Sequence, residues 1–173
     1  MKKILLHICC GPCAISVIEK LKNQGYKVIG YFYNPNIQPK SEYLKRLKSL
    51  RKLAKIIFLK LKIAKYNTKD YTGKIKNFER PTRCFACYEL RLEKTAQKAK
   101  TLGIKYFAST LLISPYQNLK KIRQIGQKLA QKYNLKFIDQ DFVKDFRQSH
   151  QKAREFELYL QKYCGCLSSL VEK

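Results

Sequence analysis

The sequence predicts a single α/β domain with a mostly parallel sheet and helices on both faces. Short apolar segments of strand length alternate with longer segments whose apolar residues recur at helical spacing, an order typical of parallel sheets with crossover helices. A length of 173 residues suits one domain with an ordinary hydrophobic core. The chain has no repeat, linker or low-complexity tract, so we expect residues 1–173 to form one unit.

The first half of the chain contains three expected strands and two expected helices. Pro12 suits the first turn of a helix with one apolar face, and Gly25 ends that helix. Ser41 is expected to cap the second helix, which is strongly basic. The expected strands cover residues 4–9, 27–33 and 57–63.

The second half is expected to alternate in the same way. Residues 64–80 are polar, rich in lysine and without a clear period, so they predict a surface loop with room for one short helix. Pro81 and Thr82 open the next helix, and Gly103 follows its end. The expected elements are a helix over 81–102, a strand over 106–112, a helix over 118–133, a strand over 135–138 and a helix over 144–163.

The charge of the chain is extreme, with 37 basic and 12 acidic side chains and a formal net charge of +25. Such a field attracts polyanions, with nucleic acid the first candidate and an anionic membrane surface the second. Because lysine far outnumbers arginine, a lysine-rich surface that is merely solvated is the alternative. Charge alone therefore favours a nucleic-acid partner without naming it.

The start of the chain predicts a cytoplasmic protein rather than a secreted or membrane protein. The apolar run from Ile4 meets His7 and two cysteines too early for a secretory signal, whose apolar region takes about 7–15 residues. No segment of the sequence approaches the roughly 18 apolar residues of a membrane helix.

Seven cysteines fall into three short groups along the chain. An odd count in an intracellular protein argues against a disulfide framework and for metal or redox chemistry. The first group follows an expected strand and precedes an expected helix, which is where α/β folds place their ligands. The groups are Cys9, Cys10 and Cys13; Cys84 and Cys87; and Cys164 and Cys166.

The Cys84 and Cys87 pair indicates which kind of metal site to expect. Cys84 and Cys87 lie three residues apart at an expected helix start, where their sulfurs share one face and the helix dipole favours thiolates. Alone, this pair fits a redox disulfide, half a zinc site or a cluster anchor. The other two groups lie more than seventy residues away on either side, unlike the compact knuckles of a zinc ribbon. A thiolate-rich site of this kind suits an iron–sulfur cluster with four cysteines, and the surplus suggests a second metal or redox-active thiols.

Several short motifs recur in the order of one known family. They are His7-Ile-Cys-Cys-Gly-Pro-Cys13, Tyr33-Asn-Pro-Asn-Ile37 with Glu42-Tyr43, Arg83-Cys-Phe-Ala-Cys87 with Leu90-Arg-Leu92 and Thr95-Ala96, Ser109-Thr-Leu-Leu-Ile-Ser-Pro-Tyr116, Asp141-Phe142 and Tyr163-Cys-Gly-Cys166. On these residues, which span nearly the whole chain, the sequence resembles the QueH family of epoxyqueuosine reductases.

The resemblance implies a Rossmann-like fold of the adenine nucleotide α-hydrolase-like class. It also implies an oxidoreductase with a [4Fe–4S] cluster and one additional iron ion. The implied reaction is the last step of queuosine formation, in which epoxyqueuosine in tRNA loses its epoxide oxygen. The implied partners are tRNAs with queuosine-type anticodons and an electron donor such as a ferredoxin or a flavodoxin.

The same resemblance assigns roles to individual residues. The implied metal ligands are Cys9, Cys10, Cys84, Cys87, Cys164 and Cys166, and the implied catalytic residues are Cys13 and Asp141. The implied substrate contacts are Tyr33, Asn34, Asn36, Tyr43, Arg83, Arg91, Ser114 and Tyr116. The tyrosines suit stacking on an unstacked base, with packing in the core as the alternative. The expected phosphate contacts lie on the basic helix, and they are Lys45, Lys48, Arg51 and Lys52.

The sequence departs from the family pattern at three positions. Gly11 stands where alanine is expected, a change of little expected consequence. Val143 and Leu160 stand where arginines are expected, which weakens the case for anion contacts near the site but not for the metal chemistry.

Two alternatives from other functional classes fit part of the sequence. A tRNA-modifying ATP pyrophosphatase would share the fold, but it needs a glycine-rich phosphate loop that Cys-Cys-Gly-Pro-Cys does not supply. A zinc-containing RNA-binding protein without catalysis is the other. Of the two histidines, His7 is expected to be a hydrogen-bonded core residue and His150 a surface residue.

Overall fold

A five-stranded sheet, all of whose pairs are parallel, forms the centre of the molecule. The computed structural model describes residues 1–76 and 79–172. The strand order is β3-β2-β1-β4-β5, and Leu5 of the central strand pairs with Ile29 on one side and Phe107 on the other. The strands are β1 (Lys2–His7), β2 (Tyr26–Phe32), β3 (Lys60–Ile63), β4 (Tyr106–Ser109) and β5 (Lys136–Phe137).

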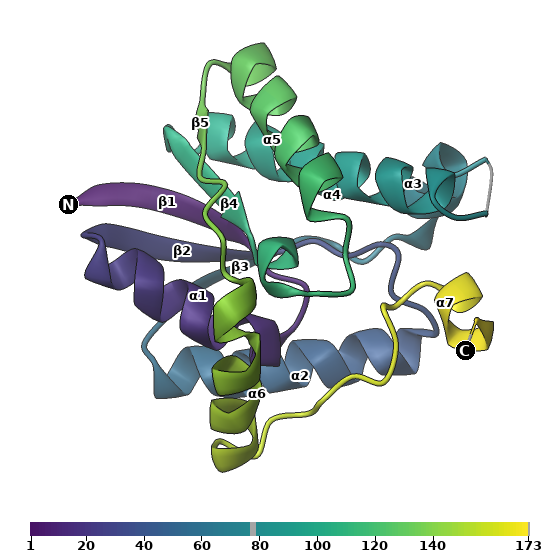
Figure 1. The fold of residues 1–173 in the computed structure, drawn as a ribbon, viewed down its shortest axis with the longest axis horizontal. Helices are drawn as coiled ribbons and strands as arrows, with labels where there is room; N and C mark the ends of the chain where they lie inside the picture. The colour runs from purple at the N-terminus through teal and green to yellow at the C-terminus, as the bar shows by residue number, and fades with distance from the viewer. Residues whose placement is uncertain (77–78, 173) are drawn as a thin grey trace.

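Helices cover both faces of this sheet, which confirms the expected α/β class. In Figure 1, α1, α2 and α6 lie on one side of the strands, and α4 and α5 lie on the other. The central strand is therefore buried on both faces, as its continuous apolar run requires. The helices are α1 (Gly11–Asn23), α2 (Lys40–Ile56), α3 (Thr68–Lys74), α4 (Thr82–Thr101), α5 (Leu119–Tyr133), α6 (Phe146–Glu155) and α7 (Leu167–Val171), with 3₁₀ turns η1 (Thr110–Ile113) and η2 (Val143–Asp145).

Some helix ends follow from local chemistry. Pro12 occupies the first turn of α1, where its missing N–H costs no hydrogen bond. The side chain of Asn118 accepts a hydrogen bond from the backbone N–H of Lys121 and so caps α5, which Asn134 ends in the left-handed conformation at φ 54°. Ser41 does not cap α2 as expected, because that helix already begins at Lys40 after an extended Pro39.

Two long elements predicted from the sequence are shorter in the structure. The strand expected over 106–112 ends at Ser109, whose hydroxyl accepts a hydrogen bond from the N–H of Leu111 and turns the chain into η1. The helix expected over 144–163 ends at Glu155, and Glu157 has a positive φ of 52° that a helix cannot continue through. Irregular backbone then leads to α7.

The third strand and the loop after it also differ from the sequence-based picture. The strand expected over 57–63 starts only at Lys60, because Phe58 takes a positive φ of 52° after the end of α2. The polar segment 64–80 contains the short helix for which it had room, α3. Residues 77–78 of that segment lie outside the described residues. None of the described helices combines the length and the apolar composition that crossing a bilayer requires.

This topology gathers the functional chain segments at the carboxyl ends of β1 and β4. The connections leave these two neighbouring strands in opposite directions across the sheet, which creates a crevice outside their ends. The C-terminal segment returns to this end of the sheet, and α7 lies there in Figure 1. His7 is fully buried as expected, between the Ser109 hydroxyl at 2.9 Å and the Tyr33 carbonyl at 3.2 Å. Burial above all lowers the pKa of His7 to about 4, so it is a neutral core residue.

Candidate metal centre

The first three cysteines form a compact sulfur group at the crevice. The Sγ atoms of Cys9, Cys10 and Cys13 all lie within 4.8 Å of one another, and all three side chains are buried. Thr110, which follows β4, fixes Cys9 from across the crevice. The N–H of Cys9 donates to the Thr110 hydroxyl at 3.1 Å, and that hydroxyl donates to Cys9 Sγ at 3.3 Å.

The spacing within this group fits ligands of one metal ion. Two sulfurs bound at about 2.3 Å to one tetrahedral ion lie about 3.8 Å apart. The Sγ atoms of Cys9 and Cys10 are separated by 3.7 Å. Gly11 allows the backbone here to approach α2, because a Cβ at this position would lie 3.1 Å from the Ser49 hydroxyl.

The three thiols share negative charge unequally. Hydrogen bonding with Cys10, and then with Cys13, holds the pKa of the Cys9 thiol well below its usual range. The same hydrogen bonds, first with Cys10 and then with Cys9, raise the pKa of Cys13. One thiolate is thus stabilised by neighbouring thiols, and a bound cation would allow the others to ionise as well.

The remaining four cysteines approach the same place from α4 and from the C-terminal segment. Cys87 and Cys166 pack together with Tyr71 and Ile75. Burial raises the pKa of Cys87 to about 12; Arg91 opposes this, and the thiols of Cys164, Cys166 and Cys84 add to it. Burial likewise raises the pKa of Cys164, which interacts with Arg91, Cys166 and Cys9. The structure therefore brings all three sequence groups to one site.

Arg91 lies inside this sulfur-rich region. Only 1% of its surface is exposed, and its Nε donates to the Cys87 carbonyl at 3.4 Å. Within the part of the chain that the structure describes, its Nη2 has no hydrogen-bond partner and no carboxylate pairs with its guanidinium. Burial opposes its charge, but the thiols of Cys87, Cys164 and Cys9 hold the pKa of Arg91 above its usual range. A buried unpaired cation costs several kcal/mol unless an anion faces it. Its placement fits a site that holds an anionic metal–thiolate group.

Arg46 fixes the C-terminal cysteines to the rest of the fold. Its guanidinium bonds to the Glu42 carboxylate at 2.7 Å and donates to the carbonyls of Cys164 and Tyr163, each at 2.9 Å. Gly165 has φ 133°, and a Cβ there would lie 3.1 Å from Ile37. Arg46 belongs to the strongly basic helix that the sequence predicts, but the structure buries it as the anchor of this loop.

A cavity of about 550 Å³ opens above the cysteines. Cys9, Cys13, Cys84 and Cys164 lie in its wall. Gln117 connects the wall to one sulfur, since its Nε2 donates to Cys164 Sγ at 3.8 Å. Other lining residues are aromatic or polar, and they include Phe85, Tyr88, Ser114, Tyr116, Phe146 and His150.

Aromatic side chains form one side of the cavity mouth. Tyr116 is 83% exposed and its ring meets Phe146 edge to face at 6.0 Å. The ring of His150 lies 4.1 Å from that of Phe146, and its Nδ1 lies 3.0 Å from the Phe146 carbonyl. His150 therefore lies in the cavity wall and not on the open surface, contrary to the sequence-based expectation. No local motif marks Phe146 or His150, because only the packing of α6 against α1 brings them here.

The expected substrate residues divide between this cavity and the protein interior. Ser114, Tyr116 and Arg91 line the cavity. The others are buried outside its described lining. Tyr33 donates a hydrogen bond to Asp70, and Asn34 donates one to the Ile8 carbonyl. The Asn36 side chain has no hydrogen-bond partner among the described residues, Tyr43 packs on Phe32 and Tyr66, and Arg83 is bonded to Glu172 at 2.6 and 2.7 Å. Side chains in these positions can support the loops beneath the site.

Two further expectations concern residues outside the sulfur group. Asp141 is exposed, accepts a hydrogen bond from the N–H of Val143, and is not among the described residues that line the cavity. The four basic residues expected to bind phosphate are all exposed on α2, and Lys52 bonds to Glu157 at 3.2 Å; they are Lys45, Lys48, Arg51 and Lys52.

Comparison with known proteins identifies the family of this chain. A family model described as epoxyqueuosine reductase QueH matches residues 4–172. The chain belongs to the QueH family. It is 36% identical over 183 residues to the epoxyqueuosine reductase QueH of Thermotoga maritima, covering 100% of this chain and 93% of that protein. It is 38% identical over 180 residues to the Helicobacter pylori protein of the same name, covering 96% of this chain and 49% of that protein.

A solved structure supports the fold independently. The chain resembles a protein described as a predicted subunit of tRNA methyltransferase from Methanocaldococcus jannaschii, with a TM-score of 0.63 and 16% identity. The match covers 90% of this chain and 75% of that one, and it shows a shared fold alone. Membership of the QueH family favours neither of the two alternatives, the zinc-containing RNA-binding protein and the ATP pyrophosphatase relative.

Proposed function

We propose that this protein is an epoxyqueuosine reductase that acts on tRNA. The reaction converts the epoxide to an alkene and water, and it consumes two electrons and two protons. Membership of the QueH family supports the proposal. The observation that carries it is the convergence of seven cysteines and the buried Arg91 beneath one cavity at the carboxyl ends of β1 and β4.

The two sulfur groups suit two different metal species. Cys9, Cys10 and Cys13 have the spacing of ligands to a single ion, and we assign them the additional iron. The other four thiols suit a [4Fe–4S] cluster, whose several iron atoms require sulfur ligands spread over a larger volume, and we assign it to Cys84, Cys87, Cys164 and Cys166. Arg91, which interacts with thiols of both groups, would balance their combined negative charge.

The chain's own residues would hold the nucleoside over the metals. When bound, the cluster supplies electrons one at a time and the iron a Lewis acid for the epoxide oxygen. Tyr116 and Phe146 offer stacking surfaces for a base drawn out of the anticodon loop. His150 can deliver a proton from Nε2 while Nδ1 stays on the Phe146 carbonyl. In this role it is better placed than Asp141, whose carboxylate accepts a hydrogen bond from the Val143 N–H outside the described cavity lining.

The proposed partners are tRNA and a small electron-transfer protein such as a ferredoxin or a flavodoxin. The net charge of +25 supports the first, and the exposed basic residues of α2 would contact phosphates. The direct test treats tRNA containing epoxyqueuosine with metallated, chemically reduced enzyme. Nucleoside mass spectrometry should then show loss of one oxygen. The proposal fails if fully metallated, reduced protein leaves that nucleoside unchanged.

Serine variants test the assignment of the two groups. Cys87→Ser should lose the cluster absorption together with activity, because its sulfur is a proposed cluster ligand. Cys13→Ser should keep the cluster absorption, contain about one iron fewer and lose activity. An iron and sulfide count with visible spectra, made on anaerobically reconstituted protein, distinguishes the two. Equal loss of the cluster in both variants would contradict two separate sites.

A further inference from the structure

A second hollow, of about 600 Å³, lies on the sheet face that carries α4. On this face α4 packs on β1 and β4, and α5 packs on β5. The hollow lies beside β2 and β3, between these strands and the C-terminal half of α4. No residue is shared between the described lining of this hollow and that of the cysteine cavity.

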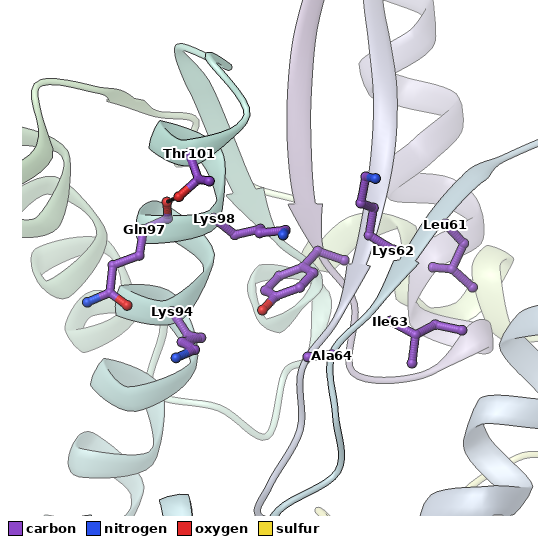
Figure 2. Close-up of a pocket in the computed structure, with 9 residues that line it drawn as sticks. Leu61, Lys62, Ile63, Ala64, Lys94, Gln97, Lys98 and Thr101 are labelled. Atoms are coloured by element: carbon purple, nitrogen blue, oxygen red, sulfur yellow. Dashed lines mark hydrogen bonds between the residues drawn. The ribbon is translucent and has the colours of Figure 1, made fainter.

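Three lysines line this hollow, and they come from its two walls. Lys94 and Lys98 come from α4 and Lys62 comes from β3, and Figure 2 shows Lys98 extending from the helix toward the strands. The ammonium of Lys94 lies 6.0 Å from the centre of the Tyr33 ring. We call the space between these three side chains the lysine hollow.

No acidic side chain of the described residues compensates the three charges of the lysine hollow. Among residues 1–76 and 79–172, none of the three ammonium groups has a carboxylate within 4.0 Å, and the described lining contains no acidic residue. A few lysines elsewhere do form ion pairs, such as Lys132 with Glu93 at 2.6 Å and Lys152 with Glu19 at 2.7 Å, so it is the gathering of three unpaired lysines at one hollow that sets this place apart. Like charges around one concave surface repel one another, and the field that they focus into it attracts an anion.

We propose that the lysine hollow binds the phosphate backbone of the tRNA substrate. The inference rests on the proposed function for the identity of the polyanion as RNA. Lysine ammonium groups are point charges with several donors, and they bind phosphate oxygens without demanding a fixed orientation. The lysine hollow thus adds a second phosphate-binding surface, on the opposite face of the sheet from α2.

Its position relative to the cysteines suits the same RNA molecule. Lys94 and Lys98 follow Cys87 on α4 by seven and eleven residues, which corresponds to about 10 and 16 Å along a helix. An RNA that presents one nucleoside to the cavity therefore has neighbouring nucleotides within reach of the lysine hollow. An acidic protein fits less well, because a specific protein interface buries about 1,000 Å² or more around an apolar centre. The lining of the lysine hollow is instead largely polar, with three lysines, a glutamine and a threonine.

The test compares two triple variants of the metallated protein. Lys62→Gln, Lys94→Gln and Lys98→Gln together remove the charge of the lysine hollow. Lys105→Gln, Lys128→Gln and Lys136→Gln remove the same charge from exposed lysines near β5, at the opposite edge of the sheet. Both proteins should keep the wild-type circular dichroism and visible spectra, because no substituted side chain is in the core.

Binding of a queuosine-type tRNA transcript is then measured over a range of salt concentrations. The lysine-hollow variant should bind at least tenfold more weakly at 0.1 M salt, and its slope of log affinity against log salt should fall by about two to three. The control variant should stay within twofold of wild type. Equal effects in the two variants, or no effect in the first, would overturn the proposal. It would also be overturned if only binding of an acidic electron-transfer protein were lost.

This experiment is separate from the test of the proposed function. Wild-type protein that reduces epoxyqueuosine while both variants bind tRNA equally refutes the lysine hollow alone. Wild-type protein that binds tRNA through the lysine hollow but never reduces the nucleoside refutes the reductase and leaves the phosphate contact standing.

Discussion

Arg46 and Arg91, two buried arginines beside the cysteines, should respond in opposite ways to replacement by methionine in the metal-free protein. Each is only 1% exposed. The guanidinium of Arg46 is bonded to the Glu42 carboxylate at 2.7 Å and to two carbonyls at 2.9 Å. That of Arg91 makes one long bond of 3.4 Å to a carbonyl, and its Nη2 has no partner.

The hydrogen bonds of each guanidinium determine how much its replacement changes the stability of the fold. Arg46→Met leaves a buried carboxylate and two carbonyls without their cation, which costs about 3–5 kcal/mol. For a domain of this size that lowers Tm by about 6–20 °C. Arg91→Met instead removes a buried charge whose burial costs several kcal/mol. Of the three thiols that interact with it, Cys87 and Cys164 have raised pKa values and are neutral without metal, so only the Cys9 thiolate offsets part of that cost. The metal-free Arg91 variant should therefore be as stable as wild type or more so.

With metal bound, the loss of Arg91 should become unfavourable. A [4Fe–4S] cluster and its thiolates are anionic, so Arg91→Met should retain less cluster after reconstitution and release it faster to a chelator. The assay is anaerobic thermal unfolding of iron-free and reconstituted protein, followed with sulfide counts. If metal-free Arg91→Met unfolds several degrees below wild type, the buried charge of Arg91 does not destabilise the metal-free protein. If the variant retains the cluster as well as wild type does, Arg91 does not balance the charge of the cluster.

Three more substitutions test individual contacts. Gly165→Ala should lower cluster content severalfold, because its Cβ would lie 3.1–3.3 Å from three side-chain atoms at φ 133°; wild-type sulfide content would contradict this. Gln117→Leu should keep the cluster but make its reduction potential more negative, since Cys164 Sγ loses a hydrogen bond; an unchanged potential in an EPR-monitored titration would contradict the contact. Tyr116→Ala should weaken binding of substrate tRNA by about 5- to 150-fold, the range for one stacked base. Phe58→Ala, at a 93% exposed aromatic outside the cavity, is its control, and equal effects would refute the stacking role.

The class of fold and the expectation of metal chemistry both follow from local features of the sequence. Alternating apolar strands and amphipathic helices predict a parallel α/β sheet, because these periods are local properties of the chain. The grouping of cysteines predicts metal chemistry for the same reason, since a Cys-x-x-Cys pair on one helix carries its geometry with it. The neutral, buried state of His7 also followed from its place within an apolar strand.

Which residues meet depends on the tertiary structure. Cys9 contacts Thr110, and Arg46 contacts Cys164, across more than 100 residues of chain. Arg46 lies on the helix that the sequence predicts to be basic, and His150 was expected on the surface. The structure buries the first and places the second in the cavity wall, because a helical pattern does not show which element packs against a given face. The order β3-β2-β1-β4-β5 and the left-handed residue Glu157, which ends the last long helix early, create those contacts. Contacts between distant segments depend on how whole elements pack, and no local period in a sequence encodes that.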